Sequence, residues 1–429
     1  MTDSMKIIRD PLWNTIRLSE TALRIIDTPS FQRLRFIRQL GLAHLVYPGA
    51  THTRFDHAVG VHHLTVTALR MLRERGGAPE EAWQDAELVP YAALLHDIGH
   101  YAYSHALEEL EPAQIPADHE EISWRFFKED SLREALEVLG PDAPERIHAL
   151  IRGESDSPLS GLISGSLDLD KMEYLRRDAR FCGVPYGEVD VDRLLEGLVL
   201  LQDPETGRWE TGVHEKAVAA MESLLFAKYQ MFRNVYWHHG VRAATALYKR
   251  IVEDAVRSGV IDKEELVGPT DEELLYEIHR RAGEMNDNPM AERLARKWIP
   301  ALRQRRLPKR ALEMSAADLH DQPIQDWVVG DSVRKRAVED RLAIELGLES
   351  GEVVIDFPQK TKMFQIDTLI RRRNGAVERL GPQGIPGVLD LPRVAADLQH
   401  TARALRVFTF ERRTVDRDHL LELLRDTAG

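Results

Sequence analysis

Residues 96–105 read HDIGHYAYSH, which places an adjacent histidine and aspartate, His96 and Asp97, ahead of two further histidines. An imidazole nitrogen beside a carboxylate oxygen suits a borderline or hard divalent metal. Two more candidate ligands flank the stretch: His57 lies 39 residues before His96, and Asp170 lies 73 residues after Asp97. Together the four would offer two nitrogens and two oxygens. The sequence therefore predicts a metal site able to polarise a phosphoryl oxygen and activate a water.

The donor types also restrict the identity of the metal. Two imidazoles and two carboxylates accept Mn, Fe, Zn, Co or Ni, and Mg less readily. We expect one such divalent transition metal per subunit, with manganese among the candidates, while Mg on the substrate phosphates stays open. The alternative interpretation is that these are unrelated histidines and carboxylates, since a lone HD dipeptide is common by chance.

Three further histidines and one glutamate near the HD pair are candidates for acid–base chemistry. His100 and His105 follow the pair closely, and His119 begins the segment HEEISWRFF. An imidazole titrates near neutral pH, so it can donate a proton or bind a phosphate. Glu108 could orient one of these rings as a carboxylate partner. Each histidine taken alone could equally be a hydrogen-bonded structural residue.

The segment DLDKMEYLRRDAR gathers chemically different groups on one face of an expected helix. At helical spacing Asp170, Tyr174 and Asp178 lie at i, i+4 and i+8, and Lys171 borders the same face. A metal carboxylate, an ammonium, an aromatic ring and a second carboxylate together suit a nucleotide. The competing interpretation is a solvated helix whose charges pair between its own turns.

A basic and aromatic segment, AKYQMFRNVYWHHGVR, spans residues 227–242. Lys228 opens it, and Tyr236 and His238 lie toward its end. Such interleaving suits a phosphate together with a base or sugar. A core helix with aromatic packing is the more common origin of the same pattern.

Apolar residues recur at helical spacing over most of the chain, which predicts a mainly α protein. Helices are expected over 21–40, 57–75, 90–98, 119–129, 133–139, 145–152, 167–180 and 214–257. Strand character is expected only late, apart from a turn or hairpin at 202–212. The expected late strands cover 353–357, 365–370 and 406–412.

The expected organisation is a helical core followed by a smaller lobe. The core covers residues 1–260, and a mixed α/β lobe covers 261–429. Beyond about residue 310 no motif indicates chemistry. We therefore expect the C-terminal lobe to provide oligomer contacts.

Composition limits the class of protein. The 429 residues carry a formal charge of −13, which argues against a general nucleic-acid or membrane-surface binder. No apolar run approaches the roughly 20 residues of a membrane span, and MTDSMKIIRD lacks a signal-peptide core. Cys182 is the only cysteine, so no intrachain disulfide can form and a cytoplasmic location is expected.

Taken together, these segments resemble the deoxynucleoside triphosphate triphosphohydrolase branch of the HD-domain family. That branch includes bacterial enzymes and vertebrate enzymes that join the HD domain to a sterile-alpha-motif domain. The resemblance begins at IIRDPLWNTIRLSETALRI and resumes at LLHDIGHYAYSH, HEEIS and DLDKMEYLRRDAR. It is strong over about residues 6–240 and weak beyond 310. It implies a helical HD core.

The resemblance implies hydrolysis of a deoxynucleoside triphosphate to a deoxynucleoside and intact triphosphate. It also implies that the metal ligands are His57, His96, Asp97 and Asp170. His105 resembles the proton donor to the leaving sugar oxygen, and the residues that resemble its support are Glu108, His119 and His100. Glu108 stands where the vertebrate relative has the shorter aspartate.

Substrate contacts follow from the same resemblance. Tyr174 is expected to crowd a ribose 2′-hydroxyl and so to favour deoxyribose. The positions that resemble phosphate, sugar or other substrate contacts are Gln39, Leu40, Arg54, Lys171, Tyr174, Asp178, Lys228, Tyr236 and His238.

Some family members are tetramers that are switched on by nucleotides bound between subunits. The resemblance therefore implies a homo-oligomer, a dimer or tetramer, and leaves open a GTP or dNTP activator. The positions that resemble activator contacts are Lys6, Asp27, Gln32, Arg35, Arg305 and Lys309. The alternative is a packed helix start with surface arginines.

Two other functions stay open. An HD phosphohydrolase acting on nucleoside monophosphates or cyclic nucleotides would release orthophosphate or a linear nucleotide. A non-enzymatic nucleotide sensor would bind deoxynucleotides without turnover. The complete set of candidate ligands argues against the sensor.

Overall fold

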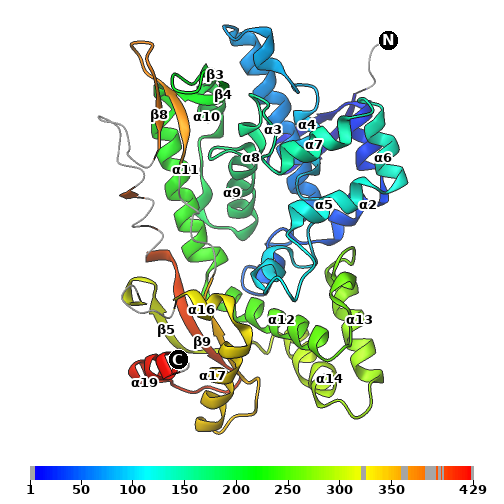
Figure 1. The fold of residues 1–429 in the computed structure, drawn as a ribbon, viewed down its shortest axis with the longest axis vertical. Coiled ribbons are helices and arrows are strands. Elements are labelled where there is room, and N and C mark those ends of the chain that lie inside the picture. The colour runs from blue at the N-terminus through cyan, green and yellow to red at the C-terminus, as the bar shows by residue number, and fades with distance from the viewer. Residues whose placement is uncertain are drawn as a thin grey trace.

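The computed structural model describes residues 5–319, 325–358, 366–381, 393–394, 398 and 401–426. The protein is mainly helical, as the sequence predicts, with small sheets and a C-terminal region that contains strands (Figure 1). The helices, in chain order, are α1 (Glu20–Ile26), α2 (Pro29–Gln32), α3 (Arg54–Arg75), α4 (Val89–Leu95), α5 (His119–Phe127), α6 (Asp130–Glu137), α7 (Ala143–Ile151), α8 (Gly161–Ser164), α9 (Leu169–Cys182), α10 (Val191–Gly197), α11 (Val218–Met231), α12 (His239–Arg257), α13 (Asp271–Glu284), α14 (Pro289–Arg293), α15 (Ile299–Arg303), α16 (Gln325–Gly330), α17 (Ser332–Glu345) and α19 (Arg417–Asp426).

Nine strands form three small sheets in the described residues. The first is an antiparallel hairpin, the second has the order β3-β4-β7-β8, and the third has the order β5-β9-β6. The strands are β1 (Lys6–Asp10), β2 (Asn14–Leu18), β3 (Leu198–Gln202), β4 (Trp209–His214), β5 (Lys309–Ser315), β6 (Val353–Asp356), β7 (Thr368–Arg371), β8 (Val377–Leu380) and β9 (Ala404–Thr409). In the third sheet β9 pairs antiparallel with both neighbours.

Two large hydrophobic cores organise the chain. The first joins apolar residues from Ile16 to Leu307 and adds some from 366–402. The second lies between the third sheet and helices α17 and α19, and includes Leu342, Val407 and Leu424. Residues of α13 to α15 thus belong to the first core, while the domain boundary at residue 260 stays a prediction.

Close packing of α3 on α9 brings two parts of the site together. Gly60 of α3 lies so near α9 that an added Cβ would overlap Glu173 Oε1 and come within 2.8 Å of Arg177 Nη2. Only glycine lets these helices approach this closely, because any side chain there would displace a buried ion pair.

Several secondary-structure predictions need correction. The continuous helix expected over 21–40 is wrong, since the chain breaks at Thr28 and Pro29 and continues as α2 and a 3₁₀ turn. Thr28 caps the new helix with its side chain, and proline fits a first helical position. The expectation of strands only late in the chain is also wrong, because the hairpin β1–β2 begins at Lys6.

Other predictions are confirmed. The hairpin expected at 202–212 is the antiparallel pair β3–β4. The expected late strands correspond to β6, β7 and β9, with Gln365 outside the described residues. The long helical stretch over 214–257 contains α11 and α12, joined by a π-helical turn, Phe232–Tyr236. Among the described residues, no helix combines the length and apolarity needed to cross a bilayer.

The Gly60→Ala substitution tests the close approach of α3 and α9. We expect a loss of about 1–3 kcal/mol in the free energy of unfolding, since the added methyl overpacks a buried ion pair. Gly283→Ala in α13 is the matched control, because nothing lies within 4 Å of its added Cβ. That variant should gain a few tenths of a kcal/mol to about 1 kcal/mol. Chemical denaturation of both measures this, and equal stabilities would contradict the packing argument.

Candidate active site

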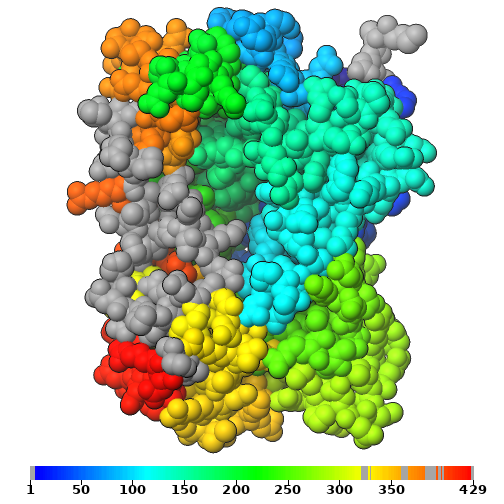
Figure 2. Space-filling view, viewed as in Figure 1, coloured from blue at the N-terminus to red at the C-terminus, as the bar shows by residue number. Residues whose placement is uncertain are grey.

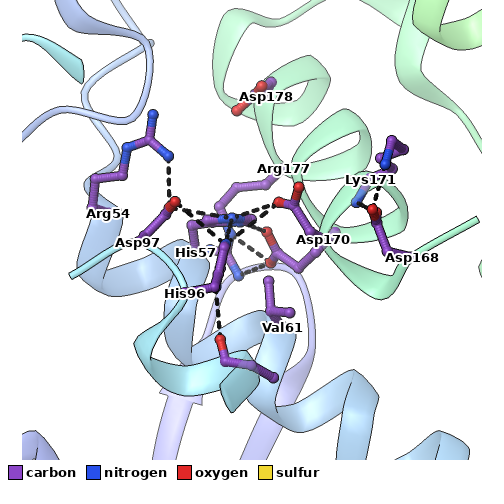
Figure 3. Close-up of polar contacts among 12 residues, drawn as sticks. Arg54, His57, Val61, His96, Asp97, Asp168, Asp170, Lys171, Arg177 and Asp178 are labelled. Atoms are coloured by element: carbon purple, nitrogen blue, oxygen red, sulfur yellow. Dashed lines mark hydrogen bonds and ion pairs between the residues drawn. The ribbon is translucent and has the colours of Figure 1, made fainter. Parts of the chain in front are cut away.

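Three helices bring the four predicted metal ligands together (Figure 3). His57 lies in the first turn of α3, His96 and Asp97 follow the end of α4, and Asp170 lies in the first turn of α9. His57 Nε2 lies 3.2 Å from His96 Nε2 and 2.9 Å from Asp170 Oδ1. Asp97 Oδ1 lies 3.4 Å from His96 Nε2.

The tautomers of the two imidazoles follow from their outer nitrogens. His57 Nδ1 donates to Glu173 Oε2 at 2.7 Å, and His96 Nδ1 donates to the Ala93 carbonyl at 2.7 Å. Because these oxygens only accept, each neutral ring keeps its lone pair on Nε2. Two lone pairs 3.2 Å apart repel unless a cation lies between them. The two imidazoles and the Asp97 carboxylate therefore fit a divalent metal by donor chemistry. Asp170 Oδ1 lies on the same side, 2.9 Å from His57 Nε2 and 3.6 Å from His96 Nε2.

The pKa of His57 shows that the residues around this ring also favour a positive charge on it. Burial lowers it, but the hydrogen bonds with Asp170 and Glu173 outweigh burial and raise the pKa to about 10. The pKa of His96 is also raised, against its burial, by Asp97 and Asp170. Metal and protons thus compete for the same nitrogens.

Glu173 is a functional candidate that the sequence reasoning missed. Besides His57, it accepts hydrogen bonds from Trp13 Nε1 at 3.0 Å and Arg177 Nε at 2.7 Å. A carboxylate behind a metal-facing imidazole fixes the ring's tautomer and orientation. The spacing could have indicated it, because Asp170, Glu173 and Arg177 lie at i, i+3 and i+7 and therefore on one face of α9.

A second cluster joins the predicted acid–base residues. Glu108, on the 3₁₀ turn η4 (Ser104–Glu109), accepts from His105 Nδ1 at 2.8 Å and from His119 Nδ1 at 2.6 Å. The His100 ring stacks on His119 with 4.0 Å between centroids. Against burial, Glu108 raises the pKa of His119, while burial and Arg54 lower the pKa of His100. The cluster therefore favours the protonated form of His119 over that of His100.

A cavity of about 630 Å³ connects the two clusters. His96, Asp97 and Asp170 line it on one side, and His105 and His119 on another. The other predicted residues in its lining are Gln39, Leu40, Arg54, Lys171, Tyr174, Asp178, Lys228 and Tyr236.

Two polar groups at this cavity are suited to a ligand. Arg54 donates through Nη1 to Asp97 Oδ2 at 2.6 Å and through Nε to Ser104 Oγ at 3.0 Å. Its Nη2 and Gln39 Oε1 are buried without a hydrogen-bond partner among the residues described. Lys171, by contrast, is held by Asp168 and the Gly165 carbonyl. Buried unpaired polar atoms are costly, so these positions favour a polar ligand.

Asp178 is fixed at the far side of the cavity. The Tyr236 hydroxyl donates to its Oδ2 at 2.7 Å, and His52 Nε2 lies 2.7 Å from its Oδ1. The Tyr174 ring lies beside Tyr236, with 6.5 Å between centroids. His52, buried beneath this group, is a second residue that the sequence reasoning missed.

Seven predicted residues belong neither to the lining of this cavity nor to the two clusters beside it. His238, Arg305 and Lys309 line a separate cavity of about 820 Å³, together with other basic side chains. The remaining predicted activator residues line neither cavity: Lys6, Asp27, Gln32 and Arg35. Arg35 stacks over the Phe55 ring and donates to Gln32.

Comparison with known families identifies the class of protein. Residues 54–178 match the HD domain, and residues 189–385 match the HD associated region. The first match begins at Arg54 and ends at Asp178, so it encloses all four predicted metal ligands. The chain belongs to the HD-domain phosphohydrolase family.

Relatives in other organisms define the chain's position more closely. It is 32% identical over 378 residues to an uncharacterized protein of Methanocaldococcus jannaschii, MJ1154, covering 88% of this chain and 74% of that one. It is 31% identical over 214 residues to human deoxynucleoside triphosphate triphosphohydrolase SAMHD1, covering 42% of this chain and 34% of SAMHD1. The chain thus spans about three quarters of the archaeal relative and about a third of the human one.

Solved structures share the fold. A hypothetical protein from Aquifex aeolicus superimposes with a TM-score of 0.71 at 27% identity, over 99% of this chain and 100% of that chain. A phosphohydrolase from Bacteroides thetaiotaomicron gives 0.72 at 22% identity, over 95% of this chain and 100% of that chain. The architecture therefore extends over nearly the whole chain.

Substitutions around His57 test the metal centre directly. His57→Ala should abolish stoichiometric binding of a divalent metal, because it removes the nitrogen nearest to both His96 and Asp170. Glu173→Gln should weaken metal affinity by roughly 10–100-fold, since the ring loses its orienting carboxylate. Competition titration with a chromogenic chelator, together with metal analysis of the purified protein, measures both effects.

Trp13→Phe is the matched control. It removes only the indole donor to Glu173 and leaves the bond between Glu173 and His57. Its metal affinity should stay within a few-fold of the parent protein. Full metal occupancy in His57→Ala would show that the ion binds elsewhere.

Proposed function

We propose that this protein hydrolyses deoxynucleoside triphosphates to deoxynucleosides and inorganic triphosphate. The observation that carries the proposal is the pair of facing imidazole nitrogens, 3.2 Å apart, beside a cavity that also contains a histidine–glutamate cluster and Arg54. A metal-side group and a proton-donating group on one cavity suit phosphoester hydrolysis. The similarity to SAMHD1 supports deoxynucleoside triphosphates as the substrate class.

In this proposal His57, His96, Asp97 and Asp170 hold one divalent transition metal. When bound, such an ion polarises a phosphoryl oxygen and makes a nucleophile available near neutral pH. Asp97 also accepts a hydrogen bond from Arg54 Nη1 at 2.6 Å. In this proposal the bond orients the Asp97 carboxylate toward the other three metal ligands. Burial opposes ionisation of Asp97, but Arg54 and the neighbouring histidines hold its pKa well below the usual range.

Arg54 is the proposed phosphate ligand at the reacting centre. Its buried Nη2 lacks a partner among the described residues, so it can donate to a phosphate oxygen without giving up the Asp97 bond. Lys171 and Lys228, also in the lining, are proposed to face the outer phosphates. Binding there requires Lys171 to share or leave Asp168.

His105 is proposed to donate the proton to the leaving 5′-oxygen. Its side chain is 43% exposed, whereas His100 and His119 are more buried, so it can meet a substrate atom. Glu108 would hold the His105 ring and stabilise its protonated form, as it does for His119. His100 stays neutral and packs the cluster against Asp97.

The sugar is proposed to lie between Tyr174 and Asp178. Tyr236 and His52 fix the Asp178 carboxylate, which can then accept from a sugar hydroxyl. Gln39 Oε1 is a second available acceptor. The Tyr174 ring would leave room at C2′ for the hydrogen of a deoxyribose but not for the hydroxyl of a ribose.

Nucleotide activation within a homo-oligomer is a second proposal. The 820 Å³ cavity brings His238, Arg305 and Lys309 together with further arginines, which suits an anionic ligand. Lys6, Asp27, Gln32 and Arg35 are proposed to complete such a site from another subunit.

A product assay tests the proposed function. The protein is incubated with Mn²⁺ or Mg²⁺ and each deoxynucleoside triphosphate, singly and mixed, and the products are separated by ion-exchange chromatography. We expect deoxynucleoside and triphosphate in equal amounts. Turnover only in mixtures or with added GTP would also support nucleotide activation. Orthophosphate from monophosphates, or opening of cyclic nucleotides, would instead establish a different phosphohydrolase, and binding without turnover would establish a sensor.

The proton donor can be tested separately from the metal. His105→Ala should lower kcat by roughly 10²–10⁴-fold, which is the usual contribution of a positioned acid. Metal content should remain that of the parent protein, because His105 does not contact His57 or Asp170. An unchanged kcat would remove His105 from the mechanism.

A further inference from the structure

Four charged side chains from three distant segments meet beside the cavity, two of them buried (Arg242 and Asp356) and two partly buried (Glu109 and Lys249). Glu109 ends the η4 turn, Arg242 and Lys249 lie on α12, and Asp356 ends β6. Arg242 donates to both oxygens of Glu109 at 2.8 and 2.7 Å, and to Asp356 at 2.8 and 2.5 Å. Lys249 donates to Glu109 at 2.7 Å and to Asp356 at 3.3 Å. The guanidinium thus joins the η4 turn to the third sheet.

The η4 turn carries the groups assigned above to proton transfer. His105 and Glu108 lie within it, and Glu109 is its last residue. At its start Tyr103 and Ser104 have φ of 57° and 58°, a left-handed conformation that is strained for residues with side chains. The Tyr103 N–H donates to Asp271 Oδ1 at 2.6 Å. The turn is therefore held at its start by Asp271 and at its end by Arg242.

Asp356 balances the charge at the second anchor. Without it, the buried Arg242 and the partly buried Lys249 would face one carboxylate, and an uncompensated buried charge is strongly unfavourable. Burial opposes ionisation of Asp356, but Arg242 and then Lys249 lower its pKa. A second contact lies nearby, where the Ser332 N–H of α17 donates to Glu111, just beyond η4. Figure 2 shows the yellow residues of α16 and α17 against the cyan segment after η4.

We propose that Asp356 and Arg242 are positioning residues for the proton-donating cluster, so that strand β6 of the C-terminal region completes the active cavity. Neither residue is required to touch the reacting atoms. Arg242 fixes Glu109, Glu109 fixes the end of η4, and η4 sets where His105 and Glu108 point. The kinetic part of this inference rests on the proposed function, whereas the structural part does not.

The chain offers a matched control for a merely structural role. Arg250 of the same helix, α12, pairs with Glu339 of α17, and both side chains are buried. That ion pair also joins α12 to the C-terminal region, but it is separate from the ion pairs of Arg242 with Glu109 and Asp356. Glu339 also accepts from the Ile355 N–H of β6 at 2.8 Å, and the amide oxygen of a glutamine at this position can still accept that bond. Removing one carboxylate from each pair therefore separates general destabilisation from an effect on the turn.

The experiment compares Asp356→Asn with Glu339→Gln in the full chain. Metal content, kcat, KM and backbone hydrogen exchange over residues 103–110 are measured for both. For Asp356→Asn we expect a kcat at least tenfold lower, unchanged metal content and KM, and at least tenfold faster exchange in the turn. Glu339→Gln should leave kcat and exchange in the turn within a factor of two. Equal losses in both variants, or normal exchange in Asp356→Asn, would overturn the proposal.

A second, more conservative variant tests the proposal if Asp356→Asn does not fold. Arg242→Lys keeps the charge balance but loses the fork that binds two carboxylates at once. We expect the same faster exchange over residues 103–110 without any substrate present, and unchanged exchange would overturn the proposal. If the parent protein does not hydrolyse deoxynucleotides, kcat is measured with bis(4-nitrophenyl) phosphate. Failure of the proposed function is then distinguished from failure of this inference by the exchange data.

Discussion

The close approach of two imidazole nitrogens, His57 Nε2 and His96 Nε2 at 3.2 Å, imposes the main constraint on this molecule. Two lone pairs at this distance repel unless a proton or a metal ion lies between them, and the surrounding carboxylates favour such a positive charge. Asp97 and Asp170 supply negative charge, while Glu173 fixes the His57 ring from behind. Gly60 then lets α3 and α9 come close enough for these groups to meet. The packing of α3 on α9 therefore sets the distances between the side chains of the site.

The cluster around His57 and Asp97 and the cluster around Glu108 are joined by direct contacts. Arg54 binds Asp97 with one nitrogen and Ser104, the first residue of η4, with another. The His100 ring lies between Asp97 Oδ1, at 3.1 Å, and the stacked His119. A shift of one cluster is therefore transmitted to the other through short, buried contacts. This explains why residues with such different roles are so closely spaced along the chain.

The local part of the site could be predicted from the sequence, and the long-range part could not. The HD pair, His57 and the stripe on α9 depend on spacing within helices. The structure brings the HD pair and the stripe to one cavity, with His57 buried directly behind His96 and Asp170. Glu173 shares a helical face with Asp170, but the bonds of Glu173 to His57 and of His52 to Asp178 join segments far apart in the chain, so spacing alone did not predict these contacts. The same holds for Asp356, whose partners Arg242 and Lys249 lie on α12, in a distant segment of the chain.

The fold was likewise predictable where the signal is local, and not where it depends on segments far apart in the chain. Helical periodicity identified the elements, but it could not show that Thr28 and Pro29 end one helix and begin another, because both segments share apolar spacing. The hairpin β1–β2 was missed since its strands are only five residues each and half exposed, which weakens any alternation. Pairings between distant strands, such as β4 with β7, have no local signature at all.

The order of synthesis gives the third sheet a particular meaning. Strand β6 pairs only with β9 in this sheet, and β9 is among the last elements of the described chain to leave the ribosome. Until β9 arrives, Asp356 has no partner strand to hold it against Arg242. The bridge from η4 through Arg242 to β6 can therefore form only after β9 has been made. The geometry of this turn is thereby coupled to the folding of the C-terminal strands.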